Sequence, residues 1–210
     1  MGGNWARERR RDHYYRKAKR EGYRSRASYK LMQLNERFRL FNAGDTVVEL
    51  GASPGGWTQV LVEITGPGGM VVAVDMAPMR DIEGATFIKG DMTEPATLEA
   101  IRAALEGVGE ANAVVSDMAP NISGNYTWDQ ARSVDLAERA LETAVEILRP
   151  GGCFAAKVFA GIDLDRYLEM VGKWFMSVRV HRPAASRRAS SEIYVIAKGF
   201  RRRRDPAAPV

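Results

Sequence analysis

The sequence predicts an α/β fold: a seven-stranded, mostly parallel sheet with one antiparallel strand and helices on both faces. Three observations carry this prediction. Strand and helix patterns alternate along the chain after residue 45, most strand segments are short apolar runs, and the last two strands lie only about ten residues apart. With 210 residues, of which 45% are hydrophobic, the chain can fill the core of one such domain.

The elements are predicted from hydrophobic periodicity and from the Gly and Pro residues between them. The expected strands are 46–50, 70–75, 86–89, 112–117, 153–159, 177–181 and 192–198. The expected helices are 27–39, 57–64, 98–105, 129–148 and 164–175. The last two strands are too close in sequence for a helical crossover, so we expect them to pair antiparallel.

Charge is segregated along the chain, within a net charge of +5. Residues 1–39 carry 13 Lys and Arg against 4 Asp and Glu, residues 179–204 carry 9 against 1, and residues 40–178 carry 9 against 20. Two basic ends flanking an acidic body indicate a polyanionic partner, RNA or the ribosome. Basic tails that serve only solubility are the alternative. Tyrosines suited to stacking on bases lie among the N-terminal arginines: Tyr14, Tyr15 and Tyr23.

The residue types that are scarce narrow the setting. A single cysteine, Cys153, excludes an internal disulfide and fits a reducing compartment. The N-terminus does not resemble a signal peptide, and no run approaches the roughly 18 apolar residues of a membrane span. We therefore expect a cytoplasmic protein without a membrane partner. His13 and His181 are isolated, so no metal site is expected.

A glycine-rich loop follows the first predicted strand. The run Glu-Leu-Gly-Ala-Ser-Pro-Gly-Gly-Trp at 49–57 opens a helix, and glycine allows a tight turn and close approach to a ligand. Asp75 ends the second strand, where a carboxylate can accept hydrogen bonds from ribose hydroxyls, and Asp91 follows the third, where it could reach an adenine amino group. The spacing fits neither the dinucleotide nor the Walker motif. The pattern predicts a pocket for an adenosine-containing cofactor; a loop and a cap that only end strands are the alternatives.

Two charged residues lie at the same predicted edge of the sheet. Asp117 and Lys157 fall at or near the ends of the fourth and fifth strands, and Lys157 interrupts the apolar run 153–159. A lysine there is costly unless it is paired or functional, so both are candidates for catalysis, with a structural salt bridge between them as the alternative. Alone, Glu192 would be interpreted as a surface acid and Lys30 as an ordinary helix lysine.

Five motifs in order carry a resemblance to a known family. They are Tyr-Arg-Ser-Arg-Ala-Ser-Tyr-Lys at 23–30, Pro-Gly-Gly-Trp at 54–57, Val-Val-Ser-Asp-Met-Ala-Pro-Asn at 114–121, Lys-Val-Phe at 157–159 and Ser-Ser-Glu-Ile-Tyr at 190–194. With these motifs the sequence resembles the FtsJ/RrmJ-type ribosomal RNA large-subunit 2'-O-methyltransferases. The resemblance implies a Rossmann-like, S-adenosylmethionine-dependent methyltransferase domain at 27–200, preceded by a basic arm at 1–26 and followed by a basic tail at 201–210.

The resemblance also implies roles for individual residues. It makes Lys30, Asp117, Lys157 and Glu192 a catalytic tetrad, in which our hypothesis assigns Lys157 as proton acceptor. A lysine accepts a proton only when it is neutral, which desolvation or a like charge such as Lys30 favours and Asp117 and Glu192 oppose. The expected contacts of S-adenosylmethionine are Gly51, Gly55, Trp57, Asp75, Asp91 and Asp117.

The implied substrate is a uridine 2'-hydroxyl in 23S, large-subunit rRNA, with the 50S ribosomal subunit as partner and no role for DNA. Relatives with the same tetrad methylate tRNA anticodon loops or messenger RNA caps, and the tetrad does not separate these targets. The compact size favours the ribosomal target, while tRNA stays open. A catalytically inactive RNA-binding relative is the competing class, and the loop spacing disfavours an NAD-dependent oxidoreductase.

Overall fold

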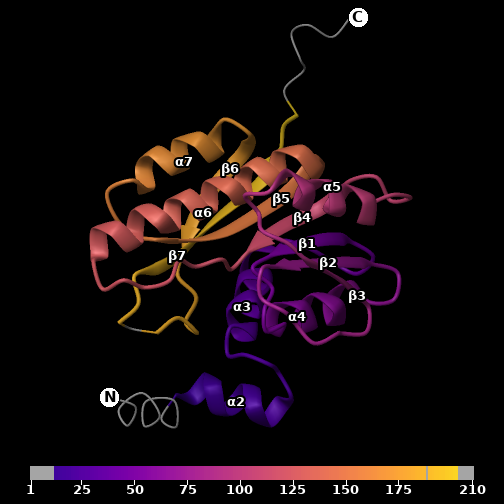
Figure 1. The fold of residues 1–210 in the computed structure, drawn as a ribbon, viewed down its shortest axis with the longest axis horizontal. Coiled ribbons are helices and arrows are strands. Elements are labelled where there is room, and N and C mark those ends of the chain that lie inside the picture. The colour runs from indigo at the N-terminus through magenta and orange to yellow at the C-terminus, as the bar shows by residue number, and fades with distance from the viewer. Residues whose placement is uncertain (1–11, 188, 203–210) are drawn as a thin grey trace, which may run out of the picture.

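The computed structural model describes residues 12–187 and 189–202. Within them one sheet of seven strands has the order β3-β2-β1-β4-β5-β7-β6 (Figure 1). The strands are β1 Thr46–Leu50, β2 Met70–Asp75, β3 Ala85–Lys89, β4 Ala111–Ser116, β5 Leu148–Phe159, β6 Phe175–His181 and β7 Glu192–Phe200. Strands β1 to β5 pair in parallel, and β7 runs antiparallel to both β5 and β6. The predicted fold class is confirmed, including the antiparallel pairing of the last two strands.

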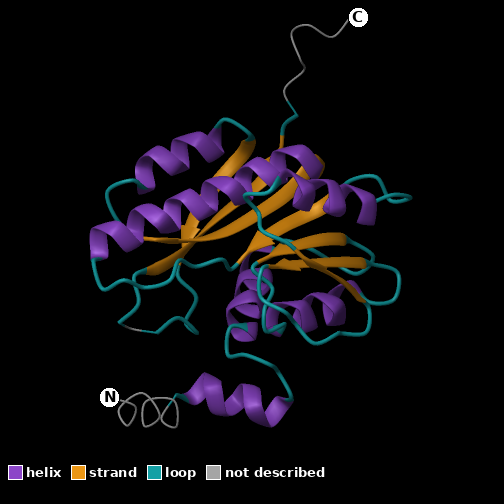
Figure 2. Cartoon of the chain, in the orientation of Figure 1, coloured by secondary structure: helices purple, strands orange, loops and turns teal. Residues whose placement is uncertain are grey.

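Helices cover both faces of the sheet (Figure 2). One face carries α3 (Ser28–Phe38) and α4 (Gly56–Thr65), and the other carries α5 (Pro95–Ala104), α6 (Tyr126–Ile147) and α7 (Leu164–Gly172). Because side chains alternate along a strand, Val48 packs into the core under α6 and Val47 into the core under α3 and α4. Both faces of β1 are buried, which explains why its sequence is β-branched or apolar at every position except Glu49.

The parallel register brings the carboxyl ends of four strands to one edge. Leu50 lies beside Val74 of β2 and Ser116 of β4, and Asp75 lies beside Lys89 of β3. The residues that follow these strands therefore meet in space although they are far apart in sequence. This edge is where an open α/β sheet binds ligands.

The described part of the predicted N-terminal arm is folded onto the domain. Helix α2 (His13–Glu21) begins after Asp12, whose side chain accepts a hydrogen bond from the Tyr15 backbone N–H at 3.1 Å. Ala18 is buried with Tyr29 and Ala185, and the Tyr29 hydroxyl donates to Glu21 at 2.7 Å. The polar, basic composition that predicted an arm gives no indication of these contacts, because they involve few apolar residues. The boundary at residue 27 stays a prediction; residues 1–11 and 203–210 lie outside the described residues.

Strand β5 begins five residues earlier than predicted. Helix α6 ends at Ile147 and the chain enters β5 directly, with Leu148 pairing with Ala111 before a register shift. The residues of β5 at this shift include Pro150, Gly151 and Gly152, which lie outside the predicted strand 153–159. Within the described residues, no helix is both long enough and apolar enough to cross a membrane.

Candidate active site

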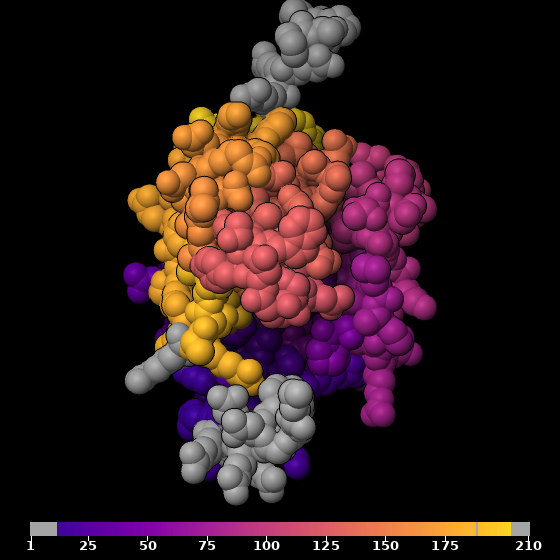
Figure 3. All heavy atoms as spheres, turned by 60° about the vertical axis from the view of Figure 1, so that its left-hand side comes forward, coloured from indigo at the N-terminus to yellow at the C-terminus, as the bar shows by residue number. Residues whose placement is uncertain are grey.

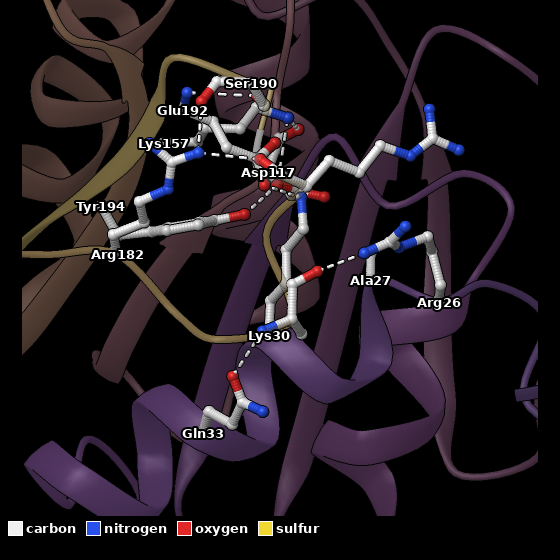
Figure 4. A network of polar contacts seen from close by, with 12 residues as sticks. Arg26, Ala27, Lys30, Gln33, Asp117, Lys157, Arg182, Ser190, Glu192 and Tyr194 are labelled. Carbon is white, nitrogen blue, oxygen red and sulfur yellow. Dashed lines mark hydrogen bonds and ion pairs between the residues drawn. The ribbon is translucent and has the colours of Figure 1, made fainter. Parts of the chain in front are cut away.

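The four residues of the predicted tetrad lie together at the carboxyl edge of the sheet (Figure 4). Lys30 comes from α3, Asp117 follows β4, Lys157 lies in β5 and Glu192 begins β7. Lys157 Nζ lies 3.0 Å from Asp117 Oδ1 and also donates to the Asp117 carbonyl oxygen. Lys30 Nζ lies 2.6 Å from Glu192 Oε1. The structure thus arranges the tetrad as two neighbouring ion pairs.

Both lysines are removed from solvent, with Lys30 8% and Lys157 7% exposed. Burial of an ion pair costs desolvation energy that its Coulomb attraction only partly offsets, so such a pair is weak evidence for a stabilising role. The salt bridge between Asp117 and Lys157 is present, as the alternative interpretation expected. Two neighbouring buried ion pairs, however, cost more desolvation free energy than a purely structural role requires. This cost favours a functional interpretation.

Tyr194 joins the tetrad and was not predicted as a site residue. Its fully buried hydroxyl donates to Asp117 Oδ1 at 2.7 Å, and Lys30 Nζ lies 5.9 Å from its ring centroid. The sequence does contain an indication of this position. Residues two apart on a strand share a face, and Tyr194 follows Glu192 at that spacing, so the two side chains are expected on the same side of the sheet. Burial raises the pKa of Tyr194 well above its ordinary value, with a further rise from the Asp117 charge, so the hydroxyl keeps its proton.

Asp117 is the residue that all these contacts share. Burial alone would raise the pKa of its carboxyl, but the charges of Lys157 and Lys30 and the hydrogen bond from Tyr194 outweigh it. The pKa of Asp117 therefore lies below its ordinary value, and the group is a carboxylate at neutral pH.

A cavity of about 330 Å³ lies beside Asp117 at the carboxyl ends of β1, β2 and β4. Four of the predicted cofactor residues line it: Gly51, Asp75, Asp91 and Asp117. Apolar walls come from Met76, Met92, Met118 and Leu136. Gly51 has φ +82°, and a Cβ there would lie 2.8 Å from the Met118 side chain, so only glycine fits this turn.

The strand-end acids are held in place by backbone N–H groups. Asp75 accepts from Ser53 N at 2.8 Å and from Ala77 N at 2.7 Å, and Asp91 accepts from Thr93 N at 2.8 Å. The hydrogen bonds from Thr93 lower the pKa of Asp91. Carboxylate oxygens fixed in this way keep lone pairs for further donors, which fits the hydroxyl and amino groups of an adenosine moiety.

Gly55 and Trp57 do not line this cavity. Trp57 is buried in the core, where its indole N–H donates to the Ala27 carbonyl at 2.8 Å and so ties α4 to α3. Gly55 has φ +103° at the start of α4, where a Cβ would come within 3.0 Å of the Arg24 guanidinium. Arg24 in turn donates to the carbonyls of Pro54, Arg80 and Asp81. These residues shape the loop, and their predicted cofactor contacts stay predictions.

A second cavity, of about 440 Å³, lies on the other side of Asp117. Three tetrad residues line it, namely Lys30, Lys157 and Glu192, together with Arg26 and Arg187. Ala119 lines both cavities, so they meet at the segment that carries Asp117. In the part of the chain that the structure describes, no group of three or more His, Cys, Asp or Glu could hold a metal ion.

The comparison with family models places this arrangement. The model described as FtsJ-like methyltransferase matches residues 23–200. The chain belongs to the FtsJ-like methyltransferase family. The resemblance predicted from the five motifs is confirmed, and the four residues of the predicted tetrad lie within the matched range.

Relatives and solved structures agree with the assignment. The methyltransferase is 53% identical over 190 residues to a ribosomal RNA large subunit methyltransferase E of Natronomonas pharaonis, covering 90% of this chain and 74% of the relative. It is 48% identical over 193 residues to one of Archaeoglobus fulgidus, covering 92% and 98%. A Plasmodium falciparum structure described as a ribosomal RNA methyltransferase shares the fold, with a TM-score of 0.74 at 23% identity, covering 85% and 98%.

Glu49 is a buried acid outside the predicted tetrad, and no role was predicted for it. It lies in β1 and is 1% exposed; its Oε2 accepts from the Thr58 hydroxyl at 2.6 Å, whereas Oε1 accepts no hydrogen bond from the described residues. Burial raises its pKa to about 8, and the charges of Asp117 and Asp75 add to the rise. At neutral pH Glu49 is therefore a protonated acid in β1, the strand that leads into the glycine-rich loop.

The raised pKa of Glu49 predicts a pH-dependent stability. Glu49 is ionised above pH 4.5 in the unfolded chain and only above about 8 in the folded protein, so its contribution is complete at low pH and falls between these values. From pH 6 to pH 8 the loss is about 2 kcal/mol. Urea unfolding should show that Glu49→Gln loses less stability over this range than the wild type. The exposed control Glu169→Gln should follow the wild type; a Glu49→Gln slope equal to the wild-type slope contradicts the assignment.

Proposed function

We propose that this methyltransferase transfers the methyl group of S-adenosylmethionine to the 2'-hydroxyl of a uridine in large-subunit rRNA. The observation that carries the proposal is the meeting of two cavities at the buried Asp117–Lys157 pair. One cavity offers strand-end carboxylates, and the other offers lysines and arginines. Transfer between two small molecules or groups needs such adjoining sites, with the reacting atoms held in line.

The cavity lined by the strand-end acids would hold the cofactor. Asp75 and Asp91 would accept hydrogen bonds from its ribose and adenine, and the methionine side chains would pack on its apolar parts. Bound there, S-adenosylmethionine supplies a methyl group activated by a positive sulfur. Asp117 lines this cavity and is paired with Lys157 of the other cavity, so its carboxylate would favour the positive end of the cofactor lying toward the acceptor side.

The cavity lined by Lys30, Lys157 and Glu192 would hold the acceptor ribose. As the ribose 2'-oxygen forms its bond to the methyl carbon, the bond between that carbon and the sulfur would break and its electron pair would leave on S-adenosylhomocysteine, while the O–H proton would pass to Lys157 Nζ. Lys157 can accept it only as a neutral amine. Asp117, hydrogen bonded to Tyr194, would hold the amine in line with the acceptor oxygen.

The large-subunit rRNA target rests on the names of the relatives and on charge. Relatives about 50% identical are named ribosomal RNA large subunit methyltransferase E. Arg26 and Arg187 line the acceptor cavity, where cations suit the phosphates of a polynucleotide. We infer that the assembled 50S subunit in the cytoplasm is the substrate, since short basic segments suit an already folded ribonucleoprotein surface.

Mapping of ribose methylation tests the substrate. Mass spectrometry of rRNA and tRNA from cells lacking the gene should show the loss of one 2'-O-methyluridine in large-subunit rRNA, with tRNA unchanged. Large subunits from those cells should regain the mark when incubated with the protein and S-adenosylmethionine. Loss of a tRNA mark with rRNA unchanged would overturn the rRNA assignment in favour of a tRNA anticodon loop. No lost mark would support an inactive RNA-binding relative.

Variants of Lys157 test its role as proton acceptor. Lys157→Ala should lower the single-turnover rate with saturating RNA by roughly 10² to 10⁴-fold. Lys157→Arg should fall nearly as far, because a guanidinium keeps the charge but does not accept a proton at neutral pH. Calorimetry should show that both variants bind S-adenosylmethionine as the wild type does, and the exposed control Lys173→Ala should keep the full rate. A rate near the wild-type value for either Lys157 variant would refute the assignment.

A further inference from the structure

Two chemically different groups of residues line the acceptor cavity, and we call them its cationic and apolar walls. Four of the lining side chains are cationic, namely Arg26, Lys30, Lys157 and Arg187, and they lie with Ser190 and with Glu192, the partner of Lys30. The other lining residues are apolar: Ala119, Ile122, Phe159 and Ala189. Figure 3 shows this face of the molecule, with the start of α6 in coral and the segment before β7 in yellow on two sides of a hollow in which indigo N-terminal residues are visible.

The apolar wall continues outward onto the protein surface. Ile122 is 68% exposed, Tyr126 59% and Ile162 85%. The Tyr126 hydroxyl donates to the Ala160 carbonyl, which places its ring next to the segment that follows Phe159. We call Ile122, Tyr126, Phe159 and Ile162 the apolar rim. Single exposed apolar residues are ordinary, but a group at the edge of a catalytic cavity indicates a ligand.

The segment that carries Ile122 is held in place before any ligand arrives. The buried Asp129 carboxylate accepts from the backbone N–H of Ser123 at 2.9 Å and of Gly124 at 3.2 Å. Asn125 caps α6 by accepting from Trp128 N at 3.2 Å. A surface fixed in this way loses little conformational entropy on binding, which suits a recognition role.

We infer that the apolar rim packs against the base of the nucleotide that is methylated, so that this base is held out of the RNA stack. The inference rests on the proposed function. A nucleotide whose 2'-oxygen lies at Lys157 has its phosphates on one side of the sugar and its base on the other. The cationic wall suits the phosphates and leaves the apolar wall for the base. A base that leaves its stack needs a new apolar or aromatic partner, and proteins that bind single-stranded RNA commonly supply one.

The rim also predicts how the base is recognised. Its one polar side-chain group, the Tyr126 hydroxyl, already donates to Ala160. Packing against apolar side chains that offer no free hydrogen-bond donor discriminates little between bases, because every base has an apolar face. The choice of nucleotide therefore depends on contacts elsewhere along the RNA, and the rim contributes affinity and orientation.

Substitution of Ile122 tests the inference in steady-state kinetics with the full-length protein. The substrate is the RNA or subunit, isolated from cells lacking the gene, that the wild-type protein methylates. Ile122→Ser should raise the KM for this substrate about tenfold, since the variant loses an apolar contact with the base. Ile122→Phe keeps an apolar surface and should restore a KM within about twofold of wild type. The kcat and the affinity for S-adenosylmethionine should stay near their wild-type values in both.

The control is Val108→Ser, because Val108 is also exposed, at 52%, but precedes β4 at the opposite edge of the sheet. Its KM should equal that of the wild type. An unchanged KM for Ile122→Ser overturns the inference, and so does an Ile122→Phe variant as impaired as Ile122→Ser. Failure of the wild-type protein to methylate any RNA from those cells counts against the proposed function, so the two failures are distinguishable.

Discussion

The pairing of Asp117 with Lys157 is the interaction on which the rest of the site depends. The Asp117 carboxylate lies 3.0 Å from Lys157 Nζ and accepts a hydrogen bond from the Tyr194 hydroxyl at 2.7 Å. It also lines the cavity that contains the strand-end acids. Burial of a carboxylate and an ammonium costs desolvation free energy. The interactions of Asp117 with two lysines and the buried Tyr194 offset part of it. The ion pair thereby joins the cavity that Asp117 lines to the cavity that Lys157 lines.

The topology of the sheet explains why these residues can meet. Parallel strands place the residues after β1, β2, β3 and β4 at one edge, which yields the glycine turn and the three strand-end acids. The antiparallel β7 then runs back beside β5 and sets Tyr194 opposite Lys157. Without that reversal, Glu192 and Tyr194 would lie at the other end of the sheet. The one antiparallel strand is therefore what completes the tetrad.

The sequence predicted the fold and the tetrad for different reasons. Hydrophobic periodicity located the strands, and β1 and β2 begin and end where expected. Lys30 and Glu192 came only from the family resemblance, since a helix lysine and a strand-end acid are ordinary alone. Glu49 could have been suspected, because it interrupts the apolar β1 as Lys157 interrupts β5. The helix at His13–Glu21 could not, because its anchoring depends on polar contacts such as Tyr29 with Glu21 that no periodicity reveals.

The most direct test of the central claim is a double-mutant cycle on single-turnover methyl transfer, with the wild type, Asp117→Asn, Lys157→Ala and the variant that carries both changes. If the two residues act as one unit, each single change should lower the rate strongly, and the double variant should be no slower than the slower single variant. Losses that multiply in the double variant would show that the two residues act independently and would contradict the account.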